Sequence, residues 1–181
     1  IVAEGIEKMQ IATGYWDIPG MALVLSELTS FLERDGTSFE LLIGKDPYVY
    51  TSLLANPKYK DASYPHDFIR TDIHDLEIID KYKSVINLLL QYCGNGKMQI
   101  RSYSKNAKGE EEFLHSKCYI FLGPSFSYGI IGSSNFTRKG LSGNSELNYL
   151  ETDPMRITGS PTYGSNAKGH TCWFEEKWEC S

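Results

Sequence analysis

The sequence predicts an α/β sandwich in one chain of 181 residues. Short apolar runs with period two alternate with longer runs in which apolar residues keep helical spacing, and this order is typical of a sheet covered by helices. A chain of this length corresponds to one domain, and its content of 41% hydrophobic and 13% aromatic residues is that of an ordinary globular protein. We therefore expect a single domain that spans residues 1–181.

Each expected element is marked by its pattern and by the residues that end it. The expected strands cover residues 9–15, 39–43, 98–103, 113–122, 126–131 and 146–151. The expected helices cover residues 21–34, 78–93 and 172–180. Gly36 ends the first helix, and Gly94-Asn95-Gly96 ends the second. We expect loops over residues 56–72 and in the Gly/Ser/Pro-rich stretch beyond Thr152.

Charge and cysteine usage restrict the class of protein. The formal net charge is −5 and the pI is near 5.4, which argues mildly against indiscriminate binding to nucleic acid, although positive charge can still be concentrated locally. The four cysteines form no CxxC pair, so we expect reduced thiols in a cytoplasmic protein. The sequence shows no signal peptide and no run of eighteen apolar residues, so we expect no membrane partner.

The first candidate site lies in the expected strand over residues 113–122. Because side chains alternate along a strand, His115 and Lys117 fall on the same face. A buried strand face rarely carries such a pair, since an unpaired buried ammonium is costly. We therefore expect an anion in front of these two side chains.

Polar residues follow the next two apolar runs. Gly132-Ser133-Ser134-Asn135 combines small residues, which let a ligand approach the backbone, with hydroxyl and amide groups that can donate to phosphate oxygens. Arg138 and Lys139 come directly afterwards and are placed to steer a phosphodiester. Glu146 begins the last expected strand, and a carboxylate near an imidazole can fix its tautomer and raise its basicity.

These residues carry a family resemblance. The series His115-x-Lys117, Gly132-Ser133-x-Asn135 and Asn144-x-Glu146 resembles the HKD motif of the phospholipase D superfamily, and its spacing is most similar to that of the metal-independent restriction-nuclease branch. The resemblance implies a phospholipase D-like α/β sandwich, with a mixed central sheet flanked by helices. It also implies roles: His115 attacks phosphorus, Lys117 and Asn135 hold the phosphate oxygens, and Glu146 orients a histidine. The expected substrate-binding residues are Ser133, Ser134, Arg138 and Lys139.

One position departs from the family pattern. The longer family signature has an aspartate where this sequence has Leu122. With period two, Leu122 lies on the opposite strand face from His115. We therefore expect Leu122 to be a supporting residue, and Glu146 to carry the carboxylate role alone.

The resemblance also bears on assembly, because this chemistry uses one histidine to attack phosphorus and another to protonate the leaving oxygen. The chain holds one such motif, and His66, His74 and His170 lack the lysine partner. We therefore expect a homodimer in which both subunits contribute His115 to one composite site. The rival interpretation is one piece of a longer protein, fused to a helicase or a DNA-recognition domain.

The expected function is a metal-independent phosphodiesterase that cleaves DNA through a phosphohistidine intermediate, as the cleavage domain of a restriction or DNA-repair enzyme. We expect no cofactor, because cations and the covalent intermediate replace a metal ion. Two alternatives stay open: a lipid or other small phosphodiester hydrolase, and a non-catalytic nucleic-acid-binding or assembly module.

Three further groups are weaker candidates. Cations and aromatics interleave in residues 56–72, which fits contact with nucleic acid and equally an ordinary exposed loop. Neither the Asp72, His74 and Asp75 group nor His170 with its neighbouring cysteines has a convincing set of metal ligands. Trp16 fits a core residue better than a rim of the site.

Overall fold

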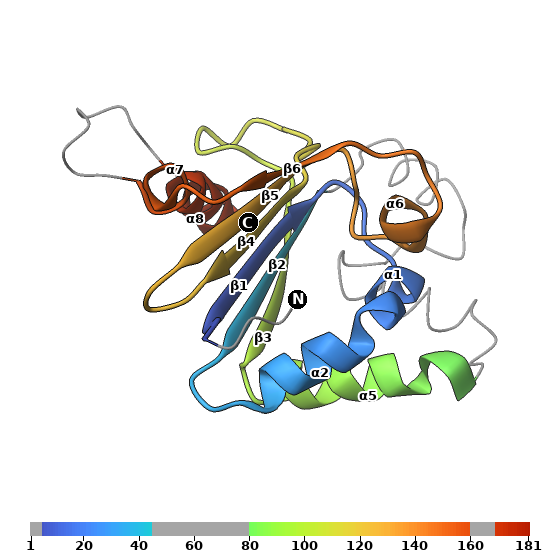
Figure 1. The fold of residues 1–181 in the computed structure, drawn as a ribbon. Coiled ribbons are helices and arrows are strands. Elements are labelled where there is room, and N and C mark those ends of the chain that lie inside the picture. Colours follow the sequence, from blue (N-terminus) through green and yellow to red (C-terminus); the bar gives the residue numbers. More distant parts are fainter. Residues whose placement is uncertain (1–4, 45–79, 160–168) are drawn as a thin grey trace, which may run out of the picture.

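A computed structural model shows a six-stranded mixed sheet with helices on both faces (Figure 1), and it describes residues 5–44, 80–159 and 169–181. The strands are β1 (Lys8–Thr13), β2 (Ser38–Gly44), β3 (Met98–Tyr103), β4 (Cys118–Leu122), β5 (Ser127–Gly132) and β6 (Asn148–Glu151). The helices are α1 (Ile18–Leu23), α2 (Leu25–Glu33), α5 (Asp80–Gly94), α6 (Arg138–Ser142), α7 (Pro154–Thr158) and α8 (His170–Glu179). The predicted α/β sandwich with a mixed sheet is confirmed.

The sheet has a parallel half and an antiparallel half. Its order is β3-β2-β1-β4-β5-β6; β1, β2 and β3 are parallel, and each later strand is antiparallel to its neighbour. In the register, Ala12 lies opposite Cys118, which lies opposite Ile131. The carboxyl ends of β1 and β5 therefore meet the amino ends of β4 and β6 at one edge of the sheet, which we call the loop edge.

The two faces of the sheet bury separate apolar clusters. On one face, Ile11 and Phe39 belong to a cluster with Phe31 of α2 and Val85 of α5. On the other face, the cluster combines strand residues with α7 and α8; its members include Ala12, Leu42, Ile120, Ile157 and Phe174. Adjacent residues of β1 thus point into opposite clusters, as the period of two requires. Figure 1 shows α7 and α8 on the side of the sheet away from α1, α2 and α5.

Several predicted boundaries are wrong for local reasons. The first predicted helix begins earlier than expected, at Ile18, because the Asp17 side chain accepts a hydrogen bond from Gly20 N at 2.6 Å and caps it. Pro19 lies in the first turn, where its missing N–H costs nothing. The prediction of one helix over residues 21–34 also fails at Val24, where the chain leaves helical geometry between α1 and α2.

Three other predictions are corrected on the loop edge and beyond it. The strand predicted over residues 113–122 begins only at Cys118, so alternation does not govern His115 and Lys117. The last strand begins at Asn148, two residues after Glu146. The loop predicted beyond Thr152 contains α7, because Asp153 caps it by accepting from Met155 N at 2.9 Å.

Predictions for residues 45–79, including the loop over 56–72 and the group around His74, lie outside the described residues. The buried position of Trp16, 8% exposed, confirms it as a core residue. In the described parts of the chain, no helix has the length and apolar character needed to cross a membrane.

Candidate active site

The loop edge gathers residues from five segments that are distant in sequence. His115 and Lys117 precede β4, residues 133–135 follow β5, and Glu146 precedes β6. Thr13 ends β1, and Gly44 ends β2. Strand pairing thus brings together segments up to about 130 residues apart.

His115 and Lys117 differ in exposure. The His115 side chain is exposed, whereas Lys117 is 7% exposed and its Nζ donates to the His115 carbonyl oxygen at 2.7 Å. Burial lowers the pKa of Lys117, and the nearby negative charge of Glu146 partly opposes this effect. This hydrogen bond ties the Lys117 side chain to the backbone of His115, so a buried cation lies at the loop edge.

Glu146 is held by two polar neighbours. Its carboxylate accepts hydrogen bonds from Ser133 Oγ and, at 3.0 Å, from Asn144 Nδ2. The bond from Ser133 is the main cause that lowers the pKa of Glu146, followed by Asn144 and the charge of Lys117. Within the described chain, the carboxylate is therefore bonded to a hydroxyl and an amide, and not to an imidazole.

Ser134 has a different environment from Ser133. It is buried, its Oγ accepts from Asn148 Nδ2 at 2.8 Å, and its carbonyl oxygen accepts from the Tyr119 hydroxyl at 2.8 Å. Ser133 is exposed, and its hydroxyl both donates to Glu146 and accepts from Leu147 N at 3.0 Å. Ser134 ties the turn after β5 to β4 and β6, so Ser133 is the more accessible of the two serines.

Asn135 is oriented by the end of β1. Its Oδ1 accepts from Tyr15 N at 3.1 Å and lies 3.4 Å from Thr13 Oγ1, and Phe136 N donates to the same Thr13 hydroxyl at 3.0 Å. Because the oxygen is used in these bonds, the amide nitrogen is the group that Asn135 can offer to a phosphate oxygen.

A close approach of two backbones brings the histidine beside Asn135. A Cβ placed on Gly14 would lie 3.2 Å from the Leu114 carbonyl oxygen and 3.6 Å from His115 Cα. A Cβ on Gly44 would overlap that same carbonyl oxygen. Glycine at both strand ends therefore lets the segment before β4 lie directly against β1 and β2.

Arg138 and Lys139 lie at the start of α6, and both are exposed. Arg138 N donates to Asp17 Oδ1 at 2.9 Å, so Asp17 joins α1 to α6. Thr137 caps α6 by accepting from Gly140 N at 3.0 Å. Both cations therefore lie on a short, capped helix next to Asn135.

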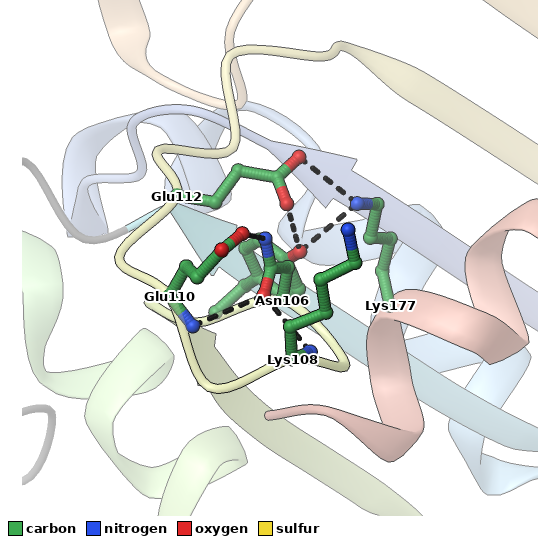
Figure 2. Close-up of polar contacts among 6 residues, drawn as sticks. Asn106, Lys108, Glu110, Glu112 and Lys177 are labelled. Carbon is green, nitrogen blue, oxygen red and sulfur yellow. Dashed lines mark hydrogen bonds and ion pairs between the residues drawn. The ribbon is translucent and has the colours of Figure 1, made fainter.

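A polar cluster anchors the segment that leads to His115 (Figure 2). Lys177 Nζ of α8 contacts Glu112 Oε1 at 3.0 Å and the Tyr103 hydroxyl at 2.9 Å, and Tyr103 donates to Glu112 Oε2 at 2.8 Å. The turn before Glu112 is closed by Asn106, whose Oδ1 accepts from Glu110 N at 3.0 Å. We call Tyr103, Glu112 and Lys177 the α8 anchor.

An apolar cavity of about 370 Å³ lies beside the site, on the face of the sheet that α2 and α6 cover. Its polar lining includes Ser134 and Asn148, and its apolar lining includes Ile11, Phe121 and Leu141. In the described residues, no group of three or more His, Cys, Asp or Glu side chains could hold a metal ion.

A comparison with protein families finds a match over most of the chain. The family described as "Cardiolipin synthase, PLD-like domain" matches residues 7–178. The chain belongs to this phospholipase D-like family. Proteins with a phospholipase D-like domain are in general phosphodiesterases. A comparison with curated proteins finds no match.

Sequence reasoning missed three contributors to the site of this phospholipase D-like domain. Thr13 and Tyr15 orient Asn135, and Asn148 holds Ser134. Polar or small residues at the end of an apolar run are the available signal for the first two, since strand ends carry site residues in α/β folds. Nothing local marks Asn148, whose partner lies 14 positions earlier.

Proposed function

We propose that this chain is a metal-independent phosphodiesterase that cleaves DNA through a phosphohistidine intermediate. The observation that supports the proposal most directly is the convergence of an exposed His115 with Lys117, Asn135 and Glu146 at one edge of the sheet. This arrangement supplies a nucleophile, a cation, an amide donor and a carboxylate. Membership of a phosphodiesterase family agrees with that chemistry.

In the proposed reaction, an imidazole nitrogen of His115 bonds to phosphorus while the bond from phosphorus to the leaving oxygen breaks. A second imidazole gives its proton to that oxygen. The second imidazole then takes a proton from water, whose oxygen attacks phosphorus and breaks the P–N bond. Lys117 and Asn135 stabilise the negative charge that develops on the non-bridging oxygens.

The second imidazole is proposed to be His115 of another copy of the chain. His170 begins α8, which packs against the opposite side of the sheet from α2 and α6, and His115 is the only histidine described at the loop edge. Strand β6 is the outermost strand of the sheet, and exposed apolar side chains lie on it and directly before it. Leu147, which follows Glu146, is 85% exposed, and Tyr149 and Leu150 of β6 are 59% and 56% exposed. Such a surface favours packing against a second copy. In that dimer, Glu146 would orient the partner's histidine.

The proposed biological setting is the cleavage domain of a restriction or DNA-repair enzyme, with a fused helicase or recognition domain supplying specificity. Arg138 and Lys139 support a polyanionic substrate, because both are exposed next to Asn135.

The apolar cavity favours a second candidate, a lipid phosphodiester. A volume of about 370 Å³ lined by Phe121, Ile130 and Leu141 fits apolar chains better than it fits a nucleotide. The cavity reaches Ser134 and Asn148, so an apolar chain there would lie close to the site.

Cleavage of DNA and hydrolysis of phosphatidylcholine by the purified chain in excess EDTA test these candidates. We expect DNA cleavage that persists in EDTA and is abolished by His115→Ala. Lipid turnover without DNA cleavage would favour the second candidate, and DNA binding without any turnover would favour a non-catalytic module. Loss of cleavage in EDTA would contradict the proposed mechanism.

The dimer is tested by mixing two inactive variants, His115→Ala and Lys117→Met, and by mass photometry. Each composite site draws on both copies, so a mixed dimer of these variants should remain inactive, whereas wild type mixed with excess His115→Ala should lose activity faster than dilution predicts. A monomer that stays active at high dilution would contradict the dimer.

A further inference from the structure

Three rings form a row at the loop edge, and the proposed function assigns a role only to the last of them. The ring centroids of Tyr15 and Phe113 are 5.8 Å apart, and those of Phe113 and His115 are also 5.8 Å apart. The rings are tilted by 55° and 36°. Tyr15, at one end of the row, is 40% exposed, and Phe113 lies between it and the proposed nucleophile.

The position of Tyr15 is fixed by groups of the site. Its backbone N donates to Asn135 Oδ1 at 3.1 Å, and its own carbonyl oxygen accepts from Thr13 Oγ1 at 2.7 Å. The preceding residue, Gly14, lies against Leu114 and His115. The hydrogen bond that orients Asn135 therefore also fixes the backbone of Tyr15, which carries the ring.

The next aromatic residue, Trp16, provides a comparison, because its role is in core packing. Trp16 is 8% exposed and belongs to the apolar cluster under α1 and α2. Tyr15 belongs to neither of the two buried clusters. Core packing therefore accounts for Trp16 and leaves the exposure of Tyr15 unexplained.

We propose that Tyr15, supported by Phe113, is a stacking platform for the base of a nucleotide adjacent to the phosphate that His115 attacks. The inference rests on the proposed function and names its substrate class, an unpaired nucleotide in a single strand. A base in a duplex is already stacked and paired, so its face is not available to the ring. Every base has such a face, and the contact is therefore tolerant of sequence.

Stacking also fits the charge of the chain. A net charge of −5 disfavours a broad basic surface as the main contact with DNA. Besides the buried Lys117, the cations described next to Asn135 are the exposed Arg138 and Lys139. Stacking of a base on an uncharged ring adds affinity that does not depend on the net charge of the protein.

The test compares two substrates of equal length, oligothymidylate and an oligomer of abasic tetrahydrofuran phosphodiesters. The variants are Tyr15→Leu, which removes the ring, and Tyr15→Phe, which keeps it. The measured quantity is the ratio of kcat/KM for the two substrates. Fluorescence anisotropy of both oligomers in the His115→Ala background gives the same ratio for binding.

A matched control is Tyr128→Leu. Tyr128 also pairs with a phenylalanine, with a centroid distance of 5.5 Å to Phe126, but it lies near the start of β5, at the other end of the sheet. Removing its ring tests for a general effect of losing a partly buried tyrosine.

We expect wild type, Tyr15→Phe and Tyr128→Leu to prefer the base-bearing oligomer by about tenfold or more, and Tyr15→Leu to bring the ratio close to one. An unchanged ratio in Tyr15→Leu would overturn the proposal, as would an equal loss on both substrates, which is the mark of a structural role. If wild type cleaves neither oligomer but its binding ratio depends on the ring, the stacking site stands and the proposed nuclease activity fails. If wild type cleaves neither oligomer and the binding ratio is also independent of the ring, both the stacking site and the proposed nuclease activity fail.

Discussion

Lys117 and Lys177 lie in opposite electrostatic surroundings within the same fold. Lys117 is buried at the loop edge, and its Nζ donates to a backbone carbonyl oxygen with no carboxylate in direct contact among the described residues. Lys177 contacts Glu112 and Tyr103 in the α8 anchor. Burial lowers the pKa of Lys117, whereas for Lys177 the bonds to Tyr103 and Glu112 outweigh burial and raise the pKa.

Lys117 therefore has no carboxylate partner among the described residues, whereas Lys177 is already paired with Glu112. A buried ammonium without a carboxylate costs stability, so its retention at the loop edge requires another reason. In the proposed function, a bound phosphate would supply the missing negative charge. The α8 anchor, in contrast, is complete within the protein and needs no ligand to satisfy its charges.

The largest expected effect is on activity, from Lys117→Met. We expect kcat to fall by about 10²–10³, because one cation that stabilises the developing charge is removed. The melting temperature should stay equal or rise, since the variant no longer buries an incompletely paired ammonium. Steady-state kinetics and calorimetry check both values. A lower melting temperature with kcat retained would make Lys117 a structural residue.

A smaller effect, mainly on stability, is expected from Lys177→Met. The change leaves Glu112 and the buried Tyr103 hydroxyl without their cation and should cost about 1 kcal/mol, because the pair is partly exposed to solvent. The control is Lys108→Met, an exposed lysine on the turn before Glu112, for which we expect a change within about 0.5 kcal/mol. Urea unfolding measures the free energies. Equal losses in the two variants would mean that the anchor contributes nothing specific.

The smallest effect is the pH dependence of Glu112→Gln. Hydrogen bonds from Tyr103 and then Lys177 hold the pKa of folded Glu112 below its ordinary value of 4.5. A depressed carboxylate pKa contributes stability above the unfolded value, and this contribution is lost as the pH falls through the folded value. The melting temperature of wild type should therefore exceed that of the variant at about pH 7, and the two should converge as the pH falls below the depressed pKa of folded Glu112. A gap that persists in acid would point to packing rather than charge.

Much of the fold could be predicted because the apolar patterns are local. The strands around Leu41, Ile100 and Ile130 alternate or form short apolar runs, and each lies within about one residue of its predicted bounds. The segment before Cys118 failed for a tertiary reason. Close contacts with Gly14 and Gly44 replace strand pairing there, and no periodicity in the segment itself records them.

For the candidate site, the sequence predicts which residues take part but not how they are arranged, and their roles stay predictions. His115, Lys117, Asn135 and Glu146 were identified from residue type and spacing, and the structure brings their segments to one edge of the sheet. The opposite exposures of His115 and Lys117 could not be predicted, because they follow from an irregular segment. The contact between Glu112 and Lys177 joins residues 65 positions apart and has no sequence signature.

The order of the strands also has a consequence for how this site can be inherited. The proposed catalytic residues and the strands β4 and β5 fall within the continuous stretch of residues 115–146, and the parallel half contributes Thr13 and Tyr15 from one strand end. A recombination event that transferred this one gene segment would therefore carry all four proposed catalytic residues. A receiving scaffold would have to supply the small residues and the hydroxyl that Gly14, Gly44 and Thr13 provide at two strand ends here.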